Sequence, residues 1–209
     1  MKKLIFVIFI PLIFSCNTDN KEFNTTDTNT TAANNQNWRP QIKKTLNEAE
    51  KVTLTFYETY LKNFYEGDGH ETPVVGITTD STYYLDTLDH IKFLDKLGCF
   101  SSEYYKNRTE VYNACRAELK KLNPGELDGP PDGDCAFMTF MIWTGGQGET
   151  LNTADILKSS ITDSTAKVVV AIGDSIGKYI YSYPTVELIR EDNKWKISGI
   201  DLSYDRPKD

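Results

Sequence analysis

The sequence predicts an α+β domain, in which helices come first along the chain and pack on one face of an antiparallel sheet. Up to residue 123, apolar side chains recur at spacings of three and four, the period of one helix face. From residue 136 onward, apolar stretches separated by polar segments are typical of strands. Because strands and helices do not alternate, the pattern favours an α+β fold.

The first predicted helix is long and amphipathic, and it ends at the breaker Gly67-Asp68-Gly69. Its apolar positions are Ile42, Leu46, Ala49, Phe56, Tyr60 and Phe64. Residues 72–80 follow as a predicted loop, because Pro73 and Gly76 interrupt any regular pattern.

Two further helices have end signals of their own. Asp86 or Thr87 can cap the second helix, and Gly98 suits the left-handed position just past its end. Its apolar stripe consists of Leu88, Ile91, Leu94 and Leu97. The pair Ser101-Ser102 can cap the third helix, which stops at Asn123-Pro124-Gly125. The expected buried face of the third helix consists of Tyr104, Val111, Cys115, Leu119 and Leu122.

Four stretches of the second half are predicted strands. They span residues 136–143, 167–172, 179–190 and 194–202. In the last stretch, Trp195 and Ile197 alternate with polar residues, which is the pattern of a half-buried strand. The polar segment Glu191-Asp192-Asn193 before it predicts a hairpin turn, and therefore antiparallel pairing of the final two strands.

Residues 1–15 have the pattern of a secretory signal, in which Lys2-Lys3 precedes an apolar run over 4–14. The run is too short to span a bilayer, which takes about 20 helical residues. Ile13-Phe14-Ser15-Cys16 resembles the lipobox of bacterial lipoproteins, which predicts cleavage before Cys16 and a lipid anchor on it. The alternatives are an ordinary cleavage site and an uncleaved anchor.

Residues 16–37 follow as a predicted disordered tether, because Asn, Thr and Asp dominate them and they hold a single large apolar residue, Phe23. Residues 38–209 have a length suited to one folded domain. The formal net charge of -7 argues against nucleic acid as a partner. We therefore expect a domain in the cell envelope, lipid-anchored to a membrane and facing the periplasm or the exterior.

Three cysteines remain in this domain, and an exported protein meets an oxidising compartment in which one disulfide can form. If Cys115 lies inside a helix from Ser102, the rise of about 1.5 Å per residue places it too far from Cys99. This favours a disulfide between Cys115 and Cys135. The alternative is that all three are small buried core residues.

Metal and phosphate motifs are weak. Of the two histidines, His70 lies with Asp68 and Glu71 in a polar turn, and His90 is expected to be a surface or packing residue. The acidic loop 126–134 lacks the spacing of a calcium-binding EF-hand. The glycines of 145–148 are not followed by the Lys-Ser or Lys-Thr of a phosphate loop. We therefore expect no metal site and no cofactor.

Residues 56–61, FYETYL, and 186–200, VELIREDNKWKISGI, together with the order of helices and strands, resemble the NTF2-like superfamily. Within it, the chain is similar to the bacterial DUF3828 group, which includes lipoproteins. The resemblance implies a cone, with N-terminal helices packed on a curved antiparallel sheet. Such cones often enclose a pocket, which implies a ligand site lined by Tyr57, Tyr60, Phe64, Trp143 and Trp195. The alternative is that these aromatic side chains are plain core.

Predicted export, a tether and the lack of a catalytic motif favour a binding or protein-interaction module. Its partner would be a protein or a small apolar ligand, and an immunity-type protein that neutralises a toxin is one variant. The alternative is an enzyme of the ketosteroid-isomerase or dehydratase type, which needs a buried carboxylate facing a tyrosine across the cone cavity. Asp134 is its one candidate acid. A purely structural lipoprotein with a filled cone is the third possibility.

Overall fold

The helices at the N-terminal end and the strands at the C-terminal end keep the predicted order in the structure, a computed structural model. It describes residues 45–66, 72–123, 125, 133–138, 142–145, 150–203 and 205–208, without the side chains of 64–66 and 138. These residues all belong to one compact unit, 35–209. The signal segment, Cys16, the tether and the polar turn with His70 lie outside the described residues, as does most of the acidic loop.

Helix α1 (Glu48–Glu66) begins later than the periodicity predicted, because residue 47 caps it. Asn47 Oδ1 accepts a hydrogen bond from Glu50 N at 2.9 Å, and Glu50 Oε2 accepts one from Asn47 N at the same distance. This reciprocal pair is a capping box, and it leaves Leu46 before the helix. The helix buries the face that carries Ala49, Phe56 and Tyr60.

Two short strands occupy part of the segment predicted as a loop. Strands β1 (Val74–Ile77) and β2 (Tyr83–Asp86) pair antiparallel, so the loop prediction for 72–80 was wrong. Tyr83 and Leu85 are buried in a small core that also holds Cys115 of helix α3 (Ser102–Leu119). A two-stranded hairpin is marginal alone, so this packing stabilises it.

Helices α2 (Leu88–Leu97) and α3 (Ser102–Leu119) confirm most of their predicted end signals. Gly98 adopts φ 62° beyond α2, and Asp86 Oδ1 accepts from Leu88 N at its start. Ser101 Oγ accepts from Tyr104 N at the start of α3. Helix α3 ends at Leu119, earlier than predicted, and it buries Tyr112 where the sequence predicted Val111.

The first predicted strand, 136–143, was wrong in its described part. Residues Gly133–Met138 form a 3₁₀ helix, η1, and 142–144 form a turn. The apolar side chains of this stretch pack against two cores: Phe137 packs against the small core on α3, whereas Trp143 enters the main core beneath the sheet. A strand that buries one face in a single core cannot place side chains in both of these cores.

The main sheet is antiparallel throughout, and its strands are ordered β3-β4-β6-β7, with β5 paired to β4. The strands are β3 (Thr153–Ile161), β4 (Thr165–Asp174), β5 (Tyr179–Ser182), β6 (Thr185–Glu191) and β7 (Lys194–Asp201). The hairpin of β6 and β7 is confirmed, with Asp192 and Asn193 at φ 51° and 62°. The predicted strand 179–190 divides at Tyr183-Pro184, and β3 was not predicted.

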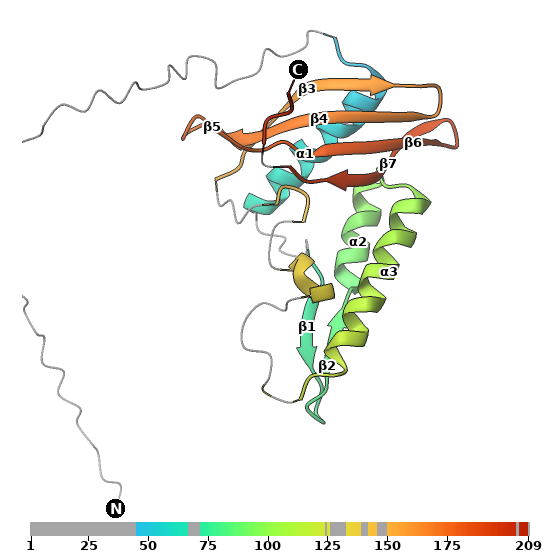
Figure 1. Cartoon of the computed structure of the whole chain (residues 1–209), viewed down its shortest axis with the longest axis vertical. Coiled ribbons are helices and arrows are strands. Elements are labelled where there is room, and N and C mark those ends of the chain that lie inside the picture. Colours follow the sequence, from blue (N-terminus) through green and yellow to red (C-terminus); the bar gives the residue numbers. More distant parts are fainter. Residues whose placement is uncertain are drawn as a thin grey trace, which may run out of the picture. The chain divides into compact units, whose positions relative to one another are not determined.

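Helix α1 lies across one face of this sheet, whereas α2 and α3 extend from its β7 edge (Figure 1). The link between α2 and α3 pairs with β7 through a parallel bridge between Phe100 and Ile197. Ser101 N donates to Ile197 O at 2.9 Å, and Ile197 N donates to Cys99 O at 2.8 Å. Only one of the three helices therefore covers the sheet face, where the sequence predicted all of them.

Candidate functional site

The space between α1 and the sheet is filled by aromatic side chains where the structure describes it. Tyr57 and Tyr60 are 0% exposed and Trp143 is 1% exposed. The rings of Tyr60 and Trp143 lie 4.8 Å apart, and those of Phe56 and Trp143 lie 5.4 Å apart, both edge to face. Three of the five predicted ligand residues are thus packed against one another or their neighbours as core.

A chain of hydrogen bonds leads from this core to the surface of α3. Tyr57 Oη donates to the carbonyl oxygen of Trp143 at 2.9 Å, and Trp143 Nε1 donates to Tyr104 Oη at 2.8 Å. Arg108 Nε also donates to Tyr104 Oη, at 3.3 Å. Burial, with a smaller contribution from Tyr104, raises the pKa of Tyr57 well above its usual value. The phenol of Tyr57 is therefore a neutral structural donor at physiological pH.

The other two predicted ligand residues are Trp195 and Phe64, and Trp195 is a further buried residue of the main core. Trp195 lies at the β6–β7 hairpin, where the Arg190 guanidinium carbon stacks 4.7 Å from its ring centroid. It lines a cavity of about 580 Å³ together with Asn47, Asp163 and other residues. Phe64 is part of α1, but its side chain lies outside the described residues.

Neither Glu50 nor Asp134 forms the buried acid–tyrosine pair that an isomerase would use, and the hydrogen bond from Tyr105 Oη to Asp95 Oδ1 lies on the surface. Glu50 is fully buried, and its Oε1 accepts from Ser159 Oγ of β3 at 2.6 Å while its Oε2 completes the capping box. Asp134 is exposed on η1, and its backbone N donates to Glu118 Oε2 at 2.9 Å. Glu50 thus joins α1 to the sheet, and Asp134 lies on the surface.

His90 and the cysteines have structural surroundings. His90 is 1% exposed, with its ring 6.0 Å from the stacked ring of Trp143 and 5.8 Å from that of Tyr112. Cys115 and Cys135 form a disulfide, the pairing that the sequence favoured, and Cys99 is a free thiol. Within the described ranges, no three His, Cys, Asp or Glu side chains form a group that could hold a metal ion.

A groove between α1 and α2 lies outside the filled interior. It has a volume of about 410 Å³. Its lining consists of Lys51, Val52, Thr55, Phe56, Thr59, Asn63, Lys96, Leu97 and Cys99. The α1 residues repeat every three or four positions, so they form one stripe along the helix. Burial raises the pKa of Cys99 to about 11, so its thiol is protonated at neutral pH.

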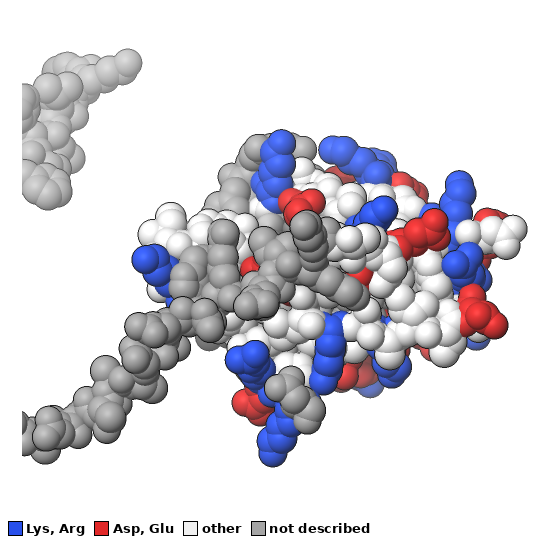
Figure 2. Space-filling view, turned by 90° about the horizontal axis from the view of Figure 1, so that it is seen from above, with Lys and Arg blue, Asp and Glu red and all other residues white. Residues whose placement is uncertain are grey.

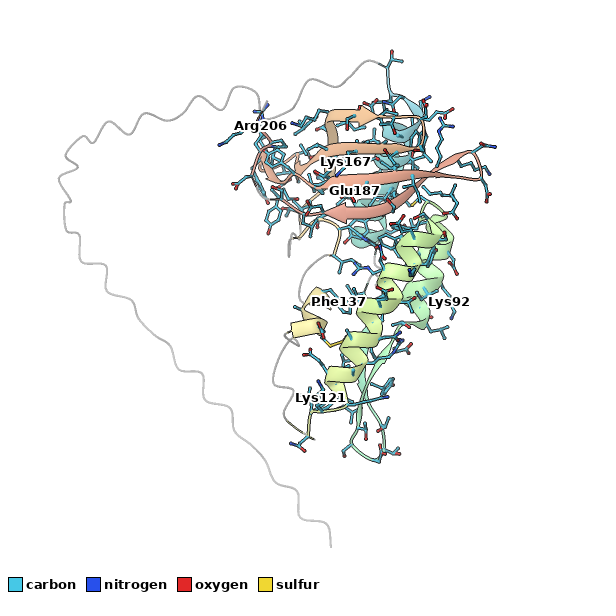
Figure 3. The ribbon with its side chains drawn as sticks, turned by 45° about the vertical axis from the view of Figure 1, so that its right-hand side comes forward. Lys92, Lys121, Phe137, Lys167, Glu187 and Arg206 are labelled. Carbon is cyan, nitrogen blue, oxygen red and sulfur yellow. A yellow bond between two sulfur atoms is a disulfide. The ribbon has the colours of Figure 1, made fainter. Side chains whose placement is uncertain are left out.

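A second external pocket lies between α3 and β7, and we call it the Arg108 pocket. It has a volume of about 190 Å³. Its lining consists of Tyr104, Asn107, Arg108, Val111, Ile142, Trp143, Ser198, Gly199 and Ile200. The half-buried guanidinium carbon of Arg108 lies 5.8 Å from the ring centroids of both Tyr104 and Phe137. Phe137 projects from η1 beside α3 (Figure 3).

The charges of the surface are mixed rather than segregated. Figure 2 shows basic and acidic side chains interspersed over the face that it draws. Lys167 and Glu187 form an exposed ion pair across β4 and β6, at 2.6 Å (Figure 3). Exposed pairs of this kind contribute little to stability. None of the described helices is long and apolar enough to cross a bilayer.

Comparison with protein-family models, with curated proteins and with solved structures gave no match to this chain.

Proposed function

We propose that the chain is an exported lipoprotein whose domain is a binding module in the cell envelope, anchored through Cys16. One observation carries the binding part of the proposal: aromatic side chains fill the described space beneath the sheet, while an apolar groove opens outside it. A filled interior leaves the outer surface as the place where a partner binds. The signal segment, the lipobox-like Ile13–Cys16 and the polar tether support the location.

The α1–α2 groove is the proposed partner site. Its floor includes Val52, Phe56 and Leu97, and exposed Lys51 and Lys96 stand at its rim. A stripe of this kind along a helix suits an amphipathic protein segment that places apolar side chains in the groove. The two lysines favour a segment with acidic flanks. An immunity-type role, with a toxin as the protein partner, is one form of this proposal.

The alternative function, an enzyme of the ketosteroid-isomerase type, has no support from the described carboxylates. Its mechanism needs a carboxylate and a tyrosine that face each other across an open cavity. Glu50 hydrogen-bonds to Ser159 and Asn47, and Asp134 is exposed. We therefore propose a non-catalytic role.

We also propose that the domain is a divergent NTF2-like cone of the DUF3828 type. The long helix α1 across an antiparallel sheet and the buried Trp195 of the last strand support this assignment. The attachment of α2 and α3 at the β7 edge is a departure from a simple cone of helices on one face. An experimental structure that superposes on an NTF2-like protein over α1 and β3–β7 would test it.

Site-specific photo-cross-linking of the full chain in its own cells tests the groove. A photoreactive phenylalanine analogue replaces Thr55, an exposed residue of the groove, or Thr109, an exposed residue of α3 outside both pockets. We expect a discrete protein adduct from position 55 and none of the same mass from position 109. No adduct from position 55, or the same adduct from both, contradicts the proposal. A Cys16→Ser variant tests the anchor separately, since it should leave the membrane fraction.

A further inference from the structure

The Arg108 pocket holds a cation that has no acidic partner among the described residues. Arg108 lines the pocket from α3, and its Nε donates a hydrogen bond to Tyr104 Oη. Among the described residues, no carboxylate forms an ion pair with its guanidinium. Arg116, two turns further along the same helix, provides a contrast: its Nη2 donates to Thr87 Oγ1 and its Nη1 to Asn113 Oδ1. Because no described residue hydrogen-bonds to the terminal nitrogens of Arg108, these nitrogens can donate to a ligand.

We propose that this pocket binds a carboxylate that carries a small apolar group, such as a branched short-chain acid or the C-terminal residue of a peptide. A guanidinium presents its N–H groups as a planar fork that matches the two oxygens of a carboxylate. Contacts with the rings of Tyr104 and Phe137 restrict the guanidinium, so little of its freedom is lost on binding.

The hydroxyl of Tyr104 can donate a second hydrogen bond to the same ligand. Its oxygen already accepts hydrogen bonds from Trp143 Nε1 and Arg108 Nε. A phenol oxygen that accepts twice still has its own proton to donate. Trp143 is itself held in place by the hydrogen bond that Tyr57 Oη donates to its carbonyl oxygen. The buried core therefore determines the position of the Tyr104 hydroxyl.

The walls and the size of the pocket define the rest of the ligand. Val111, Ile142 and Ile200 are aliphatic, and Trp143 adds an aromatic surface. The volume of about 190 Å³ suits a group of a few heavy atoms, since one water takes about 30 Å³ in the liquid. Arg108 is the one cation of the lining, which suits a singly charged carboxylate better than a phosphate of charge about -2.

This inference does not depend on the proposed partner site. The Arg108 pocket and the α1–α2 groove share no lining residue. Carboxylate binding can therefore occur when position 55 gives no cross-link, and position 55 can give a cross-link when no carboxylate binds.

Calorimetric titration of the mature full chain tests the proposal, with isobutyrate and isobutyramide as probes of equal shape. A peptide that ends in valine, with a free or an amidated C-terminus, distinguishes a peptide source from a free acid. The side-chain Nε–H signal of Arg108 in a ¹⁵N spectrum reports the site directly. Arg108→Gln removes the guanidinium, and Arg116→Gln is the matched control on the same helix.

We expect saturable binding of isobutyrate or of the free-carboxyl peptide, with a shift of the Arg108 signal. The matching amide and the Arg108→Gln variant should bind at least about tenfold more weakly, because a charge-assisted hydrogen bond is lost. Arg116→Gln should bind like the wild type. Equal binding of acid and amide by the wild type, or no saturable binding of either acid, overturns the proposal even if Arg108→Gln fails to fold.

Discussion

Two buried tyrosines, Tyr57 and Tyr112, allow a matched test of the hydrogen bonds that organise the aromatic core. Tyr57 is 0% exposed and donates to the Trp143 carbonyl, whereas Tyr112 is 2% exposed and its hydroxyl has no hydrogen-bond partner among the described residues. Replacing either residue by phenylalanine removes the same single oxygen. The two variants therefore differ in the hydrogen bond and very little in packing.

The structure predicts different effects on stability for the two variants. Tyr57→Phe leaves the buried Trp143 carbonyl without its donor, which should lower the free energy of unfolding by about 1 to 3 kcal/mol. For a domain of this size, that corresponds to a fall of about 2 to 12 °C in Tm. Tyr112→Phe removes a buried hydroxyl to which no described residue hydrogen-bonds, so it should leave stability unchanged or raise it by up to about 1 to 3 kcal/mol.

Urea denaturation followed by far-ultraviolet circular dichroism measures both variants against the wild type. The slope with denaturant should stay constant, so that the midpoints report stability alone. Equal losses in the two variants would refute the reasoning, because the effect would then come from packing and not from the Tyr57 hydrogen bond. A loss confined to Tyr112→Phe would refute it as well.

Three further predictions follow from the cysteines and the buried phenol. Replacing Cys115 and Cys135 by alanine should lower the free energy of unfolding, measured by urea denaturation, by about 3 kcal/mol, because the disulfide closes a loop with a sequence separation of 20 residues. If reduction of the wild-type disulfide left the free energy of unfolding unchanged, this prediction would be contradicted. With its pKa at about 11, the Cys99 thiol of a Cys16→Ser variant should react with iodoacetamide at pH 8 about 100-fold more slowly than a free thiol. A rate equal to that of an unstructured cysteine peptide would contradict it. Burial raises the pKa values of Tyr57 and Cys99 above their ordinary values of 10.0 and 9.0, because the folded state favours the neutral side chains. The resulting stabilisation is fully present below those ordinary values and is lost as pH rises above them. The free energy of unfolding should therefore fall above about pH 9, less steeply in Tyr57→Phe, and a flat profile to pH 11 would be inconsistent with it.

The helix ends were predictable because their signals act over one turn of chain. Gly98 takes the left-handed conformation that ends α2, and Ser101 accepts the hydrogen bond that starts α3. The β6–β7 turn is similarly local, since Asp192 and Asn193 both adopt positive φ. Each of these features depends on a few neighbouring residues, so the sequence displays it directly.

The strands that were missed have no such local signal. β3 is an edge strand whose inward Ser159 hydrogen-bonds to Glu50 of α1, so a polar residue occupies a position where alternation predicts an apolar one. The hairpin of β1 and β2 is held by a core on α3. In both cases a contact with a distant part of the chain determines the conformation.

The candidate sites also combine features that the sequence displays with features that depend on distant contacts. The sequence identified the aromatic residues Tyr57, Tyr60 and Trp143, but it could not show whether the space among them is open or filled. Arg108 was not singled out, and its spacing of four from Tyr104 was the one local signal that could have drawn attention to it. Nothing in the sequence places β7 and η1 beside these two residues.

By itself, the sequence determined that the helices precede the main antiparallel sheet, and it determined the ends of α2, the start of α3 and the final hairpin, because backbone conformation at these ends and turns follows from nearby side chains. It also predicts export and an anchor at Cys16. Only the tertiary structure decided that the aromatic residues form a packed core and that Arg108 faces a pocket. Packing density and the pairing of charges depend on residues far apart in the chain, and folding alone brings those residues together.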